Sequence, residues 1–260
     1  MKKQIVKAIM SAGVIAASML ALAGCATKSA TSKGNTAGNT IKIGVNMELS
    51  GAVAGYGEQQ KQGIELAVKQ INAAGGIKVG NTKKKITAVY RDNKSSTSGA
   101  ASVAAQLANT DKVVAIVGPA TTNDGTASIP NVTKAAVPMV SPSATDPNFT
   151  LQKNGSVQPY VFRACFNNDF QGDHAAIFAN DTLKAKNVAI IADNSTDYGT
   201  GLAKAFKKKF KGNIVTTQYY QSGDKDFNAM LTAIKSKKID AIYAPGYYSE
   251  LGLVIKQARQ

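Results

Sequence analysis

The sequence predicts an α/β protein of two lobes, each a doubly wound parallel sheet, joined by a hinge. Two observations support this prediction. From Ile41 to the end of the chain, short apolar runs rich in β-branched residues alternate with longer segments of helical period. The chain has 260 residues, of which 44% are hydrophobic, so it is long enough and apolar enough to give each lobe a core.

Seven strands and seven helices are expected from this alternation. The strands are predicted at the short apolar runs, which are residues 41–47, 85–91, 113–117, 138–141, 188–192, 213–218 and 239–244. The helices are predicted where apolar residues recur at helical spacing, at residues 57–73, 99–108, 123–135, 170–183, 199–210, 227–235 and 249–259. A crossover at residues 161–167 joins the two halves, so we expect lobe 1 at residues 41–162 and lobe 2 at residues 163–260.

The N-terminal segment has the parts of an export signal. Lysines among the first seven residues are followed by an apolar stretch at residues 8–22 and by the ending Leu-Ala-Gly-Cys at Cys25. The apolar stretch is too short and too rich in Ala and Gly to be a permanent membrane span. The ending resembles the lipobox of bacterial lipoproteins, whose cysteine carries a diacylglycerol after cleavage. We expect a signal peptide at residues 1–24 and a lipidated Cys25; a plain secretory signal with a chance cysteine is the alternative.

The segment after Cys25 reads as a flexible tether. Residues 26–40 consist of Ser, Thr, Gly, Asn, Ala and Lys and contain no large hydrophobic residue. We therefore expect residues 25–40 to connect the lipid to lobe 1, with the protein held on the extracytoplasmic face of the cell membrane.

The chain is strongly basic. Its formal net charge is +15, from 31 Lys and Arg against 16 Asp and Glu. Such an excess is typical of nucleic-acid-binding proteins. An exported lipoprotein does not meet genomic DNA, so we expect no nucleic-acid partner. The lysine excess is assigned instead to solubility and to contact with anionic lipid or wall polymer.

Function is expected in the loops that follow the strands, because ligands of open parallel sheets bind beyond the carboxyl ends of the strands. The loops after the first, third and fourth predicted strands are rich in small and hydroxylated residues: ELSGAVAGYG at 48–57, GPATTN at 118–123 and SPSATDP at 141–147. Backbone and hydroxyl groups of such loops converge on a compact polar ligand, and Tyr56 is placed to cover the apolar part of that ligand.

These loops, in this order and behind a lipobox, resemble the branched-chain amino-acid (Leu/Ile/Val)-binding family of type I periplasmic-binding proteins, the soluble receptors of ABC importers. The resemblance runs from Ile41 to the end of the chain. It is carried by the segments IGVNMELSG, GIELAVKQINAAGGI, IVGPATT, MVSPSATDP, IADNSTDYGTGLA, KDF, APGYYSELG and IKQAR. It implies a receptor that closes two lobes around an amino acid and delivers it to the membrane permease, with no bond made or broken.

The resemblance also implies which residues hold the polar end of the ligand. Thr122, Ser143 and Thr145 match positions whose hydroxyl and backbone N–H groups hold the ligand carboxylate. The Ser143 carbonyl and the Thr145 hydroxyl would also face the ammonium group. The alternative for Thr122 and Thr145 is an ordinary helix cap.

Four further residues match positions around the ligand side chain. Tyr56 matches an aromatic residue that closes over the side chain, and Ala120 matches a wall position whose small size leaves room for a branched chain. Tyr198 and Tyr247 match tyrosines of the second lobe that meet the ligand when the cleft closes. The alternative for these two tyrosines is simple packing at the lobe edges.

The end of the chain departs from the family pattern. Family members normally extend further, return to lobe 1 and supply, from lobe 2, an acidic residue that pairs with the ligand ammonium. This sequence ends at Gln260, part-way through a predicted helix, so we expect lobe 2 and the return to lobe 1 to be incomplete and the acidic partner to be absent. The ammonium then lacks an opposing charge in a partly dry cleft, and we expect weak or no binding.

Other classes of function find no support in the sequence. The single histidine, His174, has no second His or Cys at ligand spacing, so no metal site is expected. A complete dinucleotide fingerprint, a phosphate loop and a G-x-S-x-G motif are all missing, so neither a cofactor nor an enzyme is predicted. Cys165, among apolar neighbours, is expected to be a small buried residue. We expect a monomer; the alternative function is a surface lipoprotein that serves as a sensor or adhesin on the same fold.

Overall fold

The computed structural model describes residues 38–260. The predicted signal peptide at residues 1–24 and the predicted lipidation of Cys25 lie outside the described residues, as does most of the predicted tether. Within the described part of the chain, no helix is long and apolar enough to cross a membrane.

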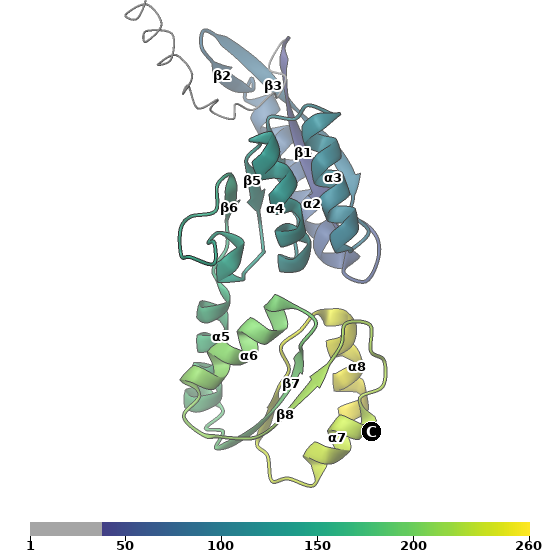
Figure 1. Cartoon of the computed structure of the whole chain (residues 1–260), viewed down its shortest axis with the longest axis vertical. Helices are drawn as coiled ribbons and strands as arrows, with labels where there is room; N and C mark the ends of the chain where they lie inside the picture. The colour runs from purple at the N-terminus through teal and green to yellow at the C-terminus, as the bar shows by residue number, and fades with distance from the viewer. Residues whose placement is uncertain (1–37) are drawn as a thin grey trace, which may run out of the picture. The chain divides into compact units, whose positions relative to one another are not determined.

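The first sheet has six strands in the order β2-β3-β1-β4-β5-β6 (Figure 1). In chain order they are β1 (Thr40–Met47), β2 (Ile77–Val79), β3 (Thr82–Asp92), β4 (Ala115–Val117), β5 (Met139–Ser141) and β6 (Val161–Arg163). Neighbouring strands pair in parallel, except that β2 and β3 form an antiparallel hairpin at one edge. Because β3 and β4 flank β1 on opposite sides, the loops that leave β1 and β4 diverge and leave a crevice at the carboxyl ends of these strands.

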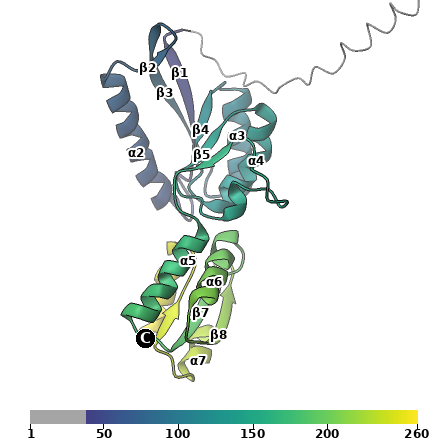
Figure 2. The same cartoon turned by 90° about the vertical axis from the view of Figure 1, so that its left-hand side faces the viewer.

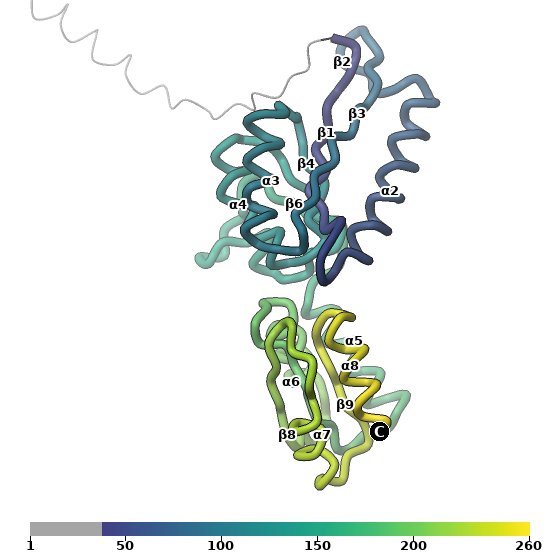
Figure 3. The backbone as a smooth tube through the Cα atoms, turned by 90° about the vertical axis from the view of Figure 1, so that its right-hand side faces the viewer, coloured from purple at the N-terminus to yellow at the C-terminus, as the bar shows by residue number. Residues whose placement is uncertain are grey.

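Three helices cover the two faces of this sheet. Helix α2 (Ala54–Ala73) lies on one side of the strands, and α3 (Thr97–Asn109) and α4 (Thr122–Ala135) lie together on the other (Figures 2 and 3). The larger core lies between α3, α4 and the sheet, where Leu107 and Met139 are fully buried. This core fixes the start of α4 at the crevice.

The second sheet has three parallel strands in the order β8-β7-β9. They are β7 (Asn187–Asp193), β8 (Asn213–Tyr220) and β9 (Ala241–Tyr243). One face carries α5 (Asn168–Ile177), which continues into the π-helical turn η2 (Phe178–Thr182), and α6 (Asp197–Lys209); the other carries α7 (Asn228–Lys235) and α8 (Tyr248–Ala258) (Figure 1). Successive side chains of a strand point to opposite faces, so Ile190 enters the α5/α6 core and Ile191 the α7/α8 core.

The predicted fold class is confirmed, and each of the predicted strands and helices is present with shifted ends. Two strands are missing from the prediction. Strand β2 has three exposed residues, so it lacks the apolar run that marks a strand in the sequence. Strand β6, also three residues long, lies within the predicted crossover. It forms because its backbone pairs in parallel with β5. The predicted lobe limits at residues 41–162 and 163–260 stay a prediction.

Candidate ligand-binding site

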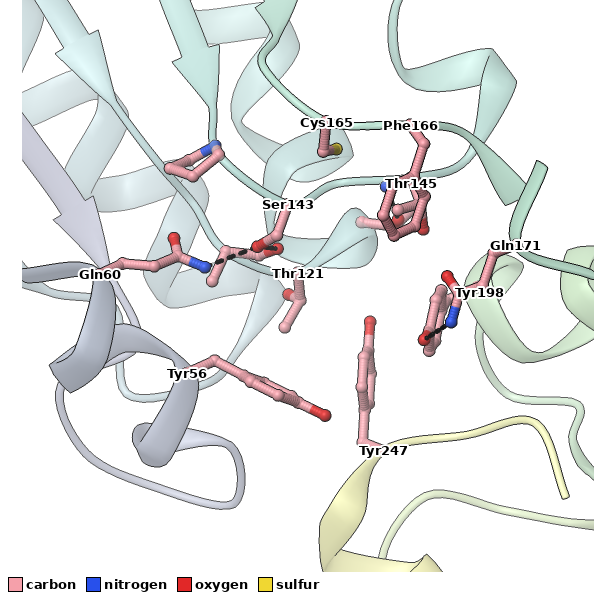
Figure 4. A pocket seen from close by; sticks show the side chains of 13 residues that line it. Tyr56, Gln60, Thr121, Ser143, Thr145, Cys165, Phe166, Gln171, Tyr198 and Tyr247 are labelled. Carbon is pink, nitrogen blue, oxygen red and sulfur yellow. Dashed lines mark hydrogen bonds between the residues drawn. The ribbon is translucent and has the colours of Figure 1, made fainter. Parts of the chain in front are cut away.

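A cavity of about 370 Å³ lies where loops of the first sheet meet loops of the second. Its volume falls in the range of small-molecule sites. The predicted site residues all line it, namely Tyr56, Ala120, Thr122, Ser143, Thr145, Tyr198 and Tyr247. Figure 4 labels all of them except Ala120 and Thr122. Six further residues line the cavity and were not predicted individually, although Thr121 and Pro142 lie in the predicted ligand loops: Gln60, Thr121, Pro142, Cys165, Phe166 and Gln171. The structure therefore brings the predicted residues to one place, and their role in binding stays a prediction.

Thr122 and Thr145 use their hydroxyls differently. The Thr122 Oγ1 accepts hydrogen bonds from the backbone N–H groups of Thr145, at 3.2 Å, and Asp146, at 3.3 Å. The Thr145 hydroxyl is buried and has no hydrogen-bond partner within residues 38–260. A buried hydroxyl without a partner costs free energy. A polar ligand group that reaches Thr145 would therefore recover that free energy.

The alternative of ordinary helix caps does not hold for these two threonines. Helix α4 is capped by Thr121, whose side chain accepts a hydrogen bond from the Asp124 N–H at 3.4 Å. The 3₁₀ helix η1 (Pro147–Phe149) is capped by Asp146. Thr122 and Thr145 each lie one position away from a capping residue and line the cavity instead.

Ser143 is held on two sides by the cavity wall. Its hydroxyl donates a hydrogen bond to the Ala120 carbonyl at 2.7 Å and accepts one from the Gln60 Nε2 at 2.6 Å. The Gln60 Oε1 is buried without a partner among the residues that the structure describes. Gln60 follows Tyr56 by one helical turn on α2, and residues four apart share a helix face. That spacing is the sequence signal that indicates Gln60 once Tyr56 is assigned.

Three tyrosine rings form another part of the wall (Figure 4). The rings of Tyr198 and Tyr247 stack with centroids 5.1 Å apart, and Tyr56 meets Tyr247 edge-on at 6.1 Å. The Gln171 Nε2 donates to the Tyr198 hydroxyl at 3.0 Å, whereas the buried Tyr247 hydroxyl has no partner in the described chain. Burial raises the pKa of both Tyr198 and Tyr247, so both hydroxyls remain protonated and able to donate. The two tyrosines both line the cavity and pack against each other, so their contact with a ligand stays a prediction.

A buried acidic pair supports the loop at the start of α4. The fully buried Glu48 carboxylate accepts hydrogen bonds from the backbone N–H groups of Ala120, at 2.9 Å, and Thr121, at 3.1 Å, and from the Thr121 hydroxyl. Burial, and next the charge of Glu48, raise the pKa of Asp124 to about 7. Two carboxyl groups in one buried site do not both ionise readily, so Asp124 keeps its proton up to neutral pH.

Cys165 is more exposed than expected. Its side chain is half-buried, lines the cavity and places Sγ 3.6 Å from the Ala144 carbonyl oxygen. Burial raises the pKa of the thiol, which disfavours the reactive thiolate. His174 is exposed on α5 and contacts the Phe170 ring, with centroids 3.9 Å apart. Residues 38–260 contain no group of three or more His, Cys, Asp or Glu side chains that could hold a metal ion.

A polar and aromatic cavity between the strand-end loops of two α/β sheets is the kind of place where small ligands bind. Residues 40–260 match the periplasmic binding protein family, and the chain belongs to that family. As a member of a family of binding proteins it is not an enzyme, as the sequence analysis predicts.

Relatives confirm the resemblance to branched-chain amino-acid-binding proteins. The Leu/Ile/Val-binding protein homolog 3 of Brucella melitensis is 36% identical over 220 residues, which are 84% of this chain and 57% of the relative. The branched-chain amino acid transporter substrate binding protein LivJ from Streptococcus pneumoniae, solved with isoleucine, is 46% identical with a TM-score of 0.78, over 85% of this chain and 61% of that protein. The leucine binding protein LivK from Thermotoga maritima is 33% identical with a TM-score of 0.75, over 85% of this chain and 60% of that protein. The chain thus spans less than two thirds of the length of these proteins.

Proposed function

We propose that the chain is the substrate-binding protein of an ABC importer and that it captures Leu, Ile or Val in the cavity. The observation that carries this proposal is the division of the cavity lining. The hydroxyl-bearing residues Thr122, Ser143 and Thr145 line one part of the cavity, and Ala120, Phe166 and the tyrosine rings line other parts. A branched-chain amino acid has the same division into a charged head and an apolar side chain. Two relatives support this ligand class, since one is a Leu/Ile/Val-binding protein homolog and the other was solved with isoleucine.

In this proposal the ligand carboxylate lies at the N-terminus of α4, beside Thr122, because a helix N-terminus favours an anion. The buried hydroxyls of Thr145 and Tyr247 have no partners within residues 38–260, so they are available to donate to the carboxylate. The Ser143 carbonyl faces the ammonium, since the Ser143 hydroxyl is already engaged by Ala120 and Gln60. Hydroxyls that gain a partner on binding lower the free energy of the bound state.

The ligand side chain is proposed to lie against Ala120 and the rings of Tyr56 and Tyr198. Ala120 is only 3% exposed, so a larger residue there would enter the cavity. Tyr56 comes from the first turn of α2 and Tyr198 from the first turn of α6, so the side chain is covered from both sheets. Contacts from both lobes are what allow a ligand to favour a closed arrangement.

Thermal unfolding and calorimetry of the chain from Ala26 test the ligand class. We expect millimolar Leu, Ile and Val each to raise the melting temperature of a chain extended beyond Gln260, and to shift the 260-residue chain less or not at all, because a ligand that binds only the native state stabilises it by mass action. Isocaproate, which lacks the ammonium, and isopentylamine, which lacks the carboxylate, are the matched controls and should give much smaller shifts. A melting temperature that none of the three amino acids moves in either chain would contradict the proposal.

Export, lipid attachment at Cys25 and delivery to a permease are further parts of the proposal. Metabolic labelling with a fatty-acid analogue should mark the wild-type chain but not Cys25→Ala.

Uptake of labelled leucine tests delivery to a permease and should fall in cells that lack the protein. Unchanged uptake would favour the alternative role as a sensor or adhesin.

A further inference from the structure

The three-stranded sheet has a lysine-rich end opposite the cavity. Because β8, β7 and β9 are parallel, the segments that lead into them lie at the same edge of the sheet. These segments are residues 181–186, 207–212 and 235–240, and they hold nine lysines, two aspartates and no arginine. We call them the lysine edge; its lysines are Lys184, Lys186, Lys207, Lys208, Lys209, Lys211, Lys235, Lys237 and Lys238.

Hydrogen bonds join the three segments into one platform. The Asn213 N–H donates to the Lys186 carbonyl at 2.7 Å. The Asp240 carboxylate accepts from the backbone N–H groups of Lys186, at 2.7 Å, and Asn187, at 2.8 Å. These bonds connect the start of each strand to its neighbour, so the lysines are presented together rather than on independent loops.

The charge of the lysine edge is largely uncompensated. Every one of its lysines is exposed, and none forms an ion pair with another residue of the described chain. The Lys207 Nζ lies 5.9 Å from the Tyr219 ring centroid, a contact that leaves the charge in place. Of the two aspartates, Asp240 accepts two backbone hydrogen bonds, and its pKa is lowered by these bonds and by the charge of Lys186, so it offsets only part of the positive charge. Like charges gathered at one edge of a sheet repel one another, so an anionic partner would relieve the repulsion.

We propose that the lysine edge binds the surface of an anionic phospholipid membrane, a role beyond the proposed capture of amino acids. Lysine meets phosphate as a flexible point charge, whereas arginine suits bidentate recognition of one defined group. A surface made of lysines alone fits many headgroups at once. The exposed Leu183, at 52%, lies within the first segment and the exposed Phe178, at 53%, lies three residues before it, and both supply apolar side chains for the headgroup zone.

The same segments are poorly suited to nucleic acid. Their single aromatic residue, Phe210, is only 8% exposed and belongs to the α5/α6 core. Within the three segments no ring is therefore free to stack on a base, and the exposed rings nearest to them are Phe178 and Tyr219.

Membrane contact at the lysine edge leaves the cavity accessible. Tyr198 follows the carboxyl end of β7 and Tyr247 the carboxyl end of β9, whereas the lysine edge lies at the amino ends of these strands. Removing lysines from this edge should therefore change membrane binding without changing amino-acid affinity.

Vesicle co-sedimentation of the chain from Ala26 tests the proposal. The probe is a vesicle of phosphatidylglycerol and phosphatidylcholine, and vesicles of phosphatidylcholine alone are the reference. The test variant combines Lys184→Gln, Lys208→Gln and Lys237→Gln, one substitution in each segment. The control combines Lys69→Gln, Lys153→Gln and Lys225→Gln, which removes the same charge from exposed positions outside the lysine edge. Melting temperatures of both variants confirm that they fold.

We expect the test variant to lose on the order of a hundred-fold in binding to anionic vesicles, since each lysine near the surface contributes about five-fold. The control variant should lose only a few-fold, and binding of the wild-type chain should fall as salt is added. Equal losses in the two variants would overturn the proposal, because net charge alone would then explain binding. Tighter binding to soluble poly(glycerol phosphate) than to vesicles at equal phosphate would also overturn it.

Discussion

The hydroxyl of Tyr248 accepts a hydrogen bond from the backbone N–H of Gly55 at 2.9 Å, between residues 193 positions apart in the sequence. Gly55 lies in the first turn of α2 and Tyr248 opens α8, and neither helix has a side-chain cap of its own. The rings of Tyr56 and Tyr248 meet edge-on at 4.9 Å. Burial raises the pKa of Tyr56, and the nearby Tyr248 backbone N–H partly opposes this. Each helix therefore begins against a tyrosine of the other lobe.

Replacing Tyr248 by Phe removes this acceptor and keeps the ring. We expect branched-chain amino acids to bind up to about five-fold more weakly, because a partly exposed hydrogen bond contributes about 1 kcal/mol or less and this one exists only while the two helix ends are together. Tyr219→Phe, at an exposed tyrosine that does not line the cavity, is the matched control. Calorimetry that gives the same affinity for Y248F and the wild-type chain would show that the bond makes no contribution to closure.

Thr145→Val and Thr122→Val are expected to separate binding from stability. The Thr145 hydroxyl has no partner in the described chain, so its loss should leave the free energy of unfolding within about 0.5 kcal/mol and weaken ligand binding about ten-fold. The Thr122 hydroxyl accepts from two buried backbone N–H groups, so its loss should destabilise the fold by about 1 to 3 kcal/mol.

Urea unfolding and calorimetry on both threonine variants check this contrast. Wild-type affinity in T145V would remove Thr145 from the proposed site. A stability loss in T145V as large as that in T122V would show that the Thr145 hydroxyl has a structural partner after all.

The raised pKa of Asp124 should lower the free energy of unfolding as the pH rises. Its pKa is about 7 in the folded chain against 3.8 in the unfolded one, so between these values the native state holds a proton that the unfolded state has lost. The free energy of unfolding therefore falls with pH in this window, by at most about 1.4 kcal/mol per pH unit. Asp124→Asn cannot ionise and should flatten this part of the profile.

Urea unfolding of the wild-type chain and D124N from about pH 4 to about pH 7.5 checks this prediction. The difference between their free energies of unfolding removes the contribution of other carboxyl groups that titrate in the same range. We expect D124N to gain relative stability as the pH increases. Parallel profiles would mean that Asp124 ionises normally.

Ala120→Val should narrow the cavity and weaken the binding of branched-chain amino acids. An added branched side chain at this buried wall position costs about 1 to 3 kcal/mol if it occupies the space of the ligand, which corresponds to a loss of about five-fold to more than a hundred-fold in isoleucine affinity. Ala52→Val, at an exposed loop position, controls for the substitution itself. Unchanged isoleucine affinity in A120V would place the ligand side chain elsewhere.

The sequence located those parts of the site that depend on strand ends. Ala120, Thr122 and Ser143 follow apolar runs whose strand character is plain, and parallel strands bring such loops to one edge. Phe166 and Gln171 could not be placed this way, because they come from the chain after β6, whose path depends on pairing with β5. Hydrogen bonds between side chains from different segments could not be predicted either, because they also depend on how distant parts of the chain come together.

The pairing of Glu48 with the α4 loop illustrates this limit. From the sequence, a glutamate directly after a strand is expected to be a solvated loop residue. Glu48 is instead a buried acceptor of three hydrogen bonds, because Ala120 and Thr121 pack against it. Strand β2 shows the converse: its residues are all exposed, so its strand state comes from the hairpin with β3 and not from burial.

The long sequence separation between Gly55 and Tyr248 also sets an order of events during synthesis. The hydroxyl-lined loops of the first sheet emerge from the ribosome well before Tyr247 and Tyr248, so a nascent chain presents only half of the cavity. Contacts between residues this far apart form late, after the loop between them has closed. Resistance to protease that depends on added amino acid would therefore mark chains that have completed folding.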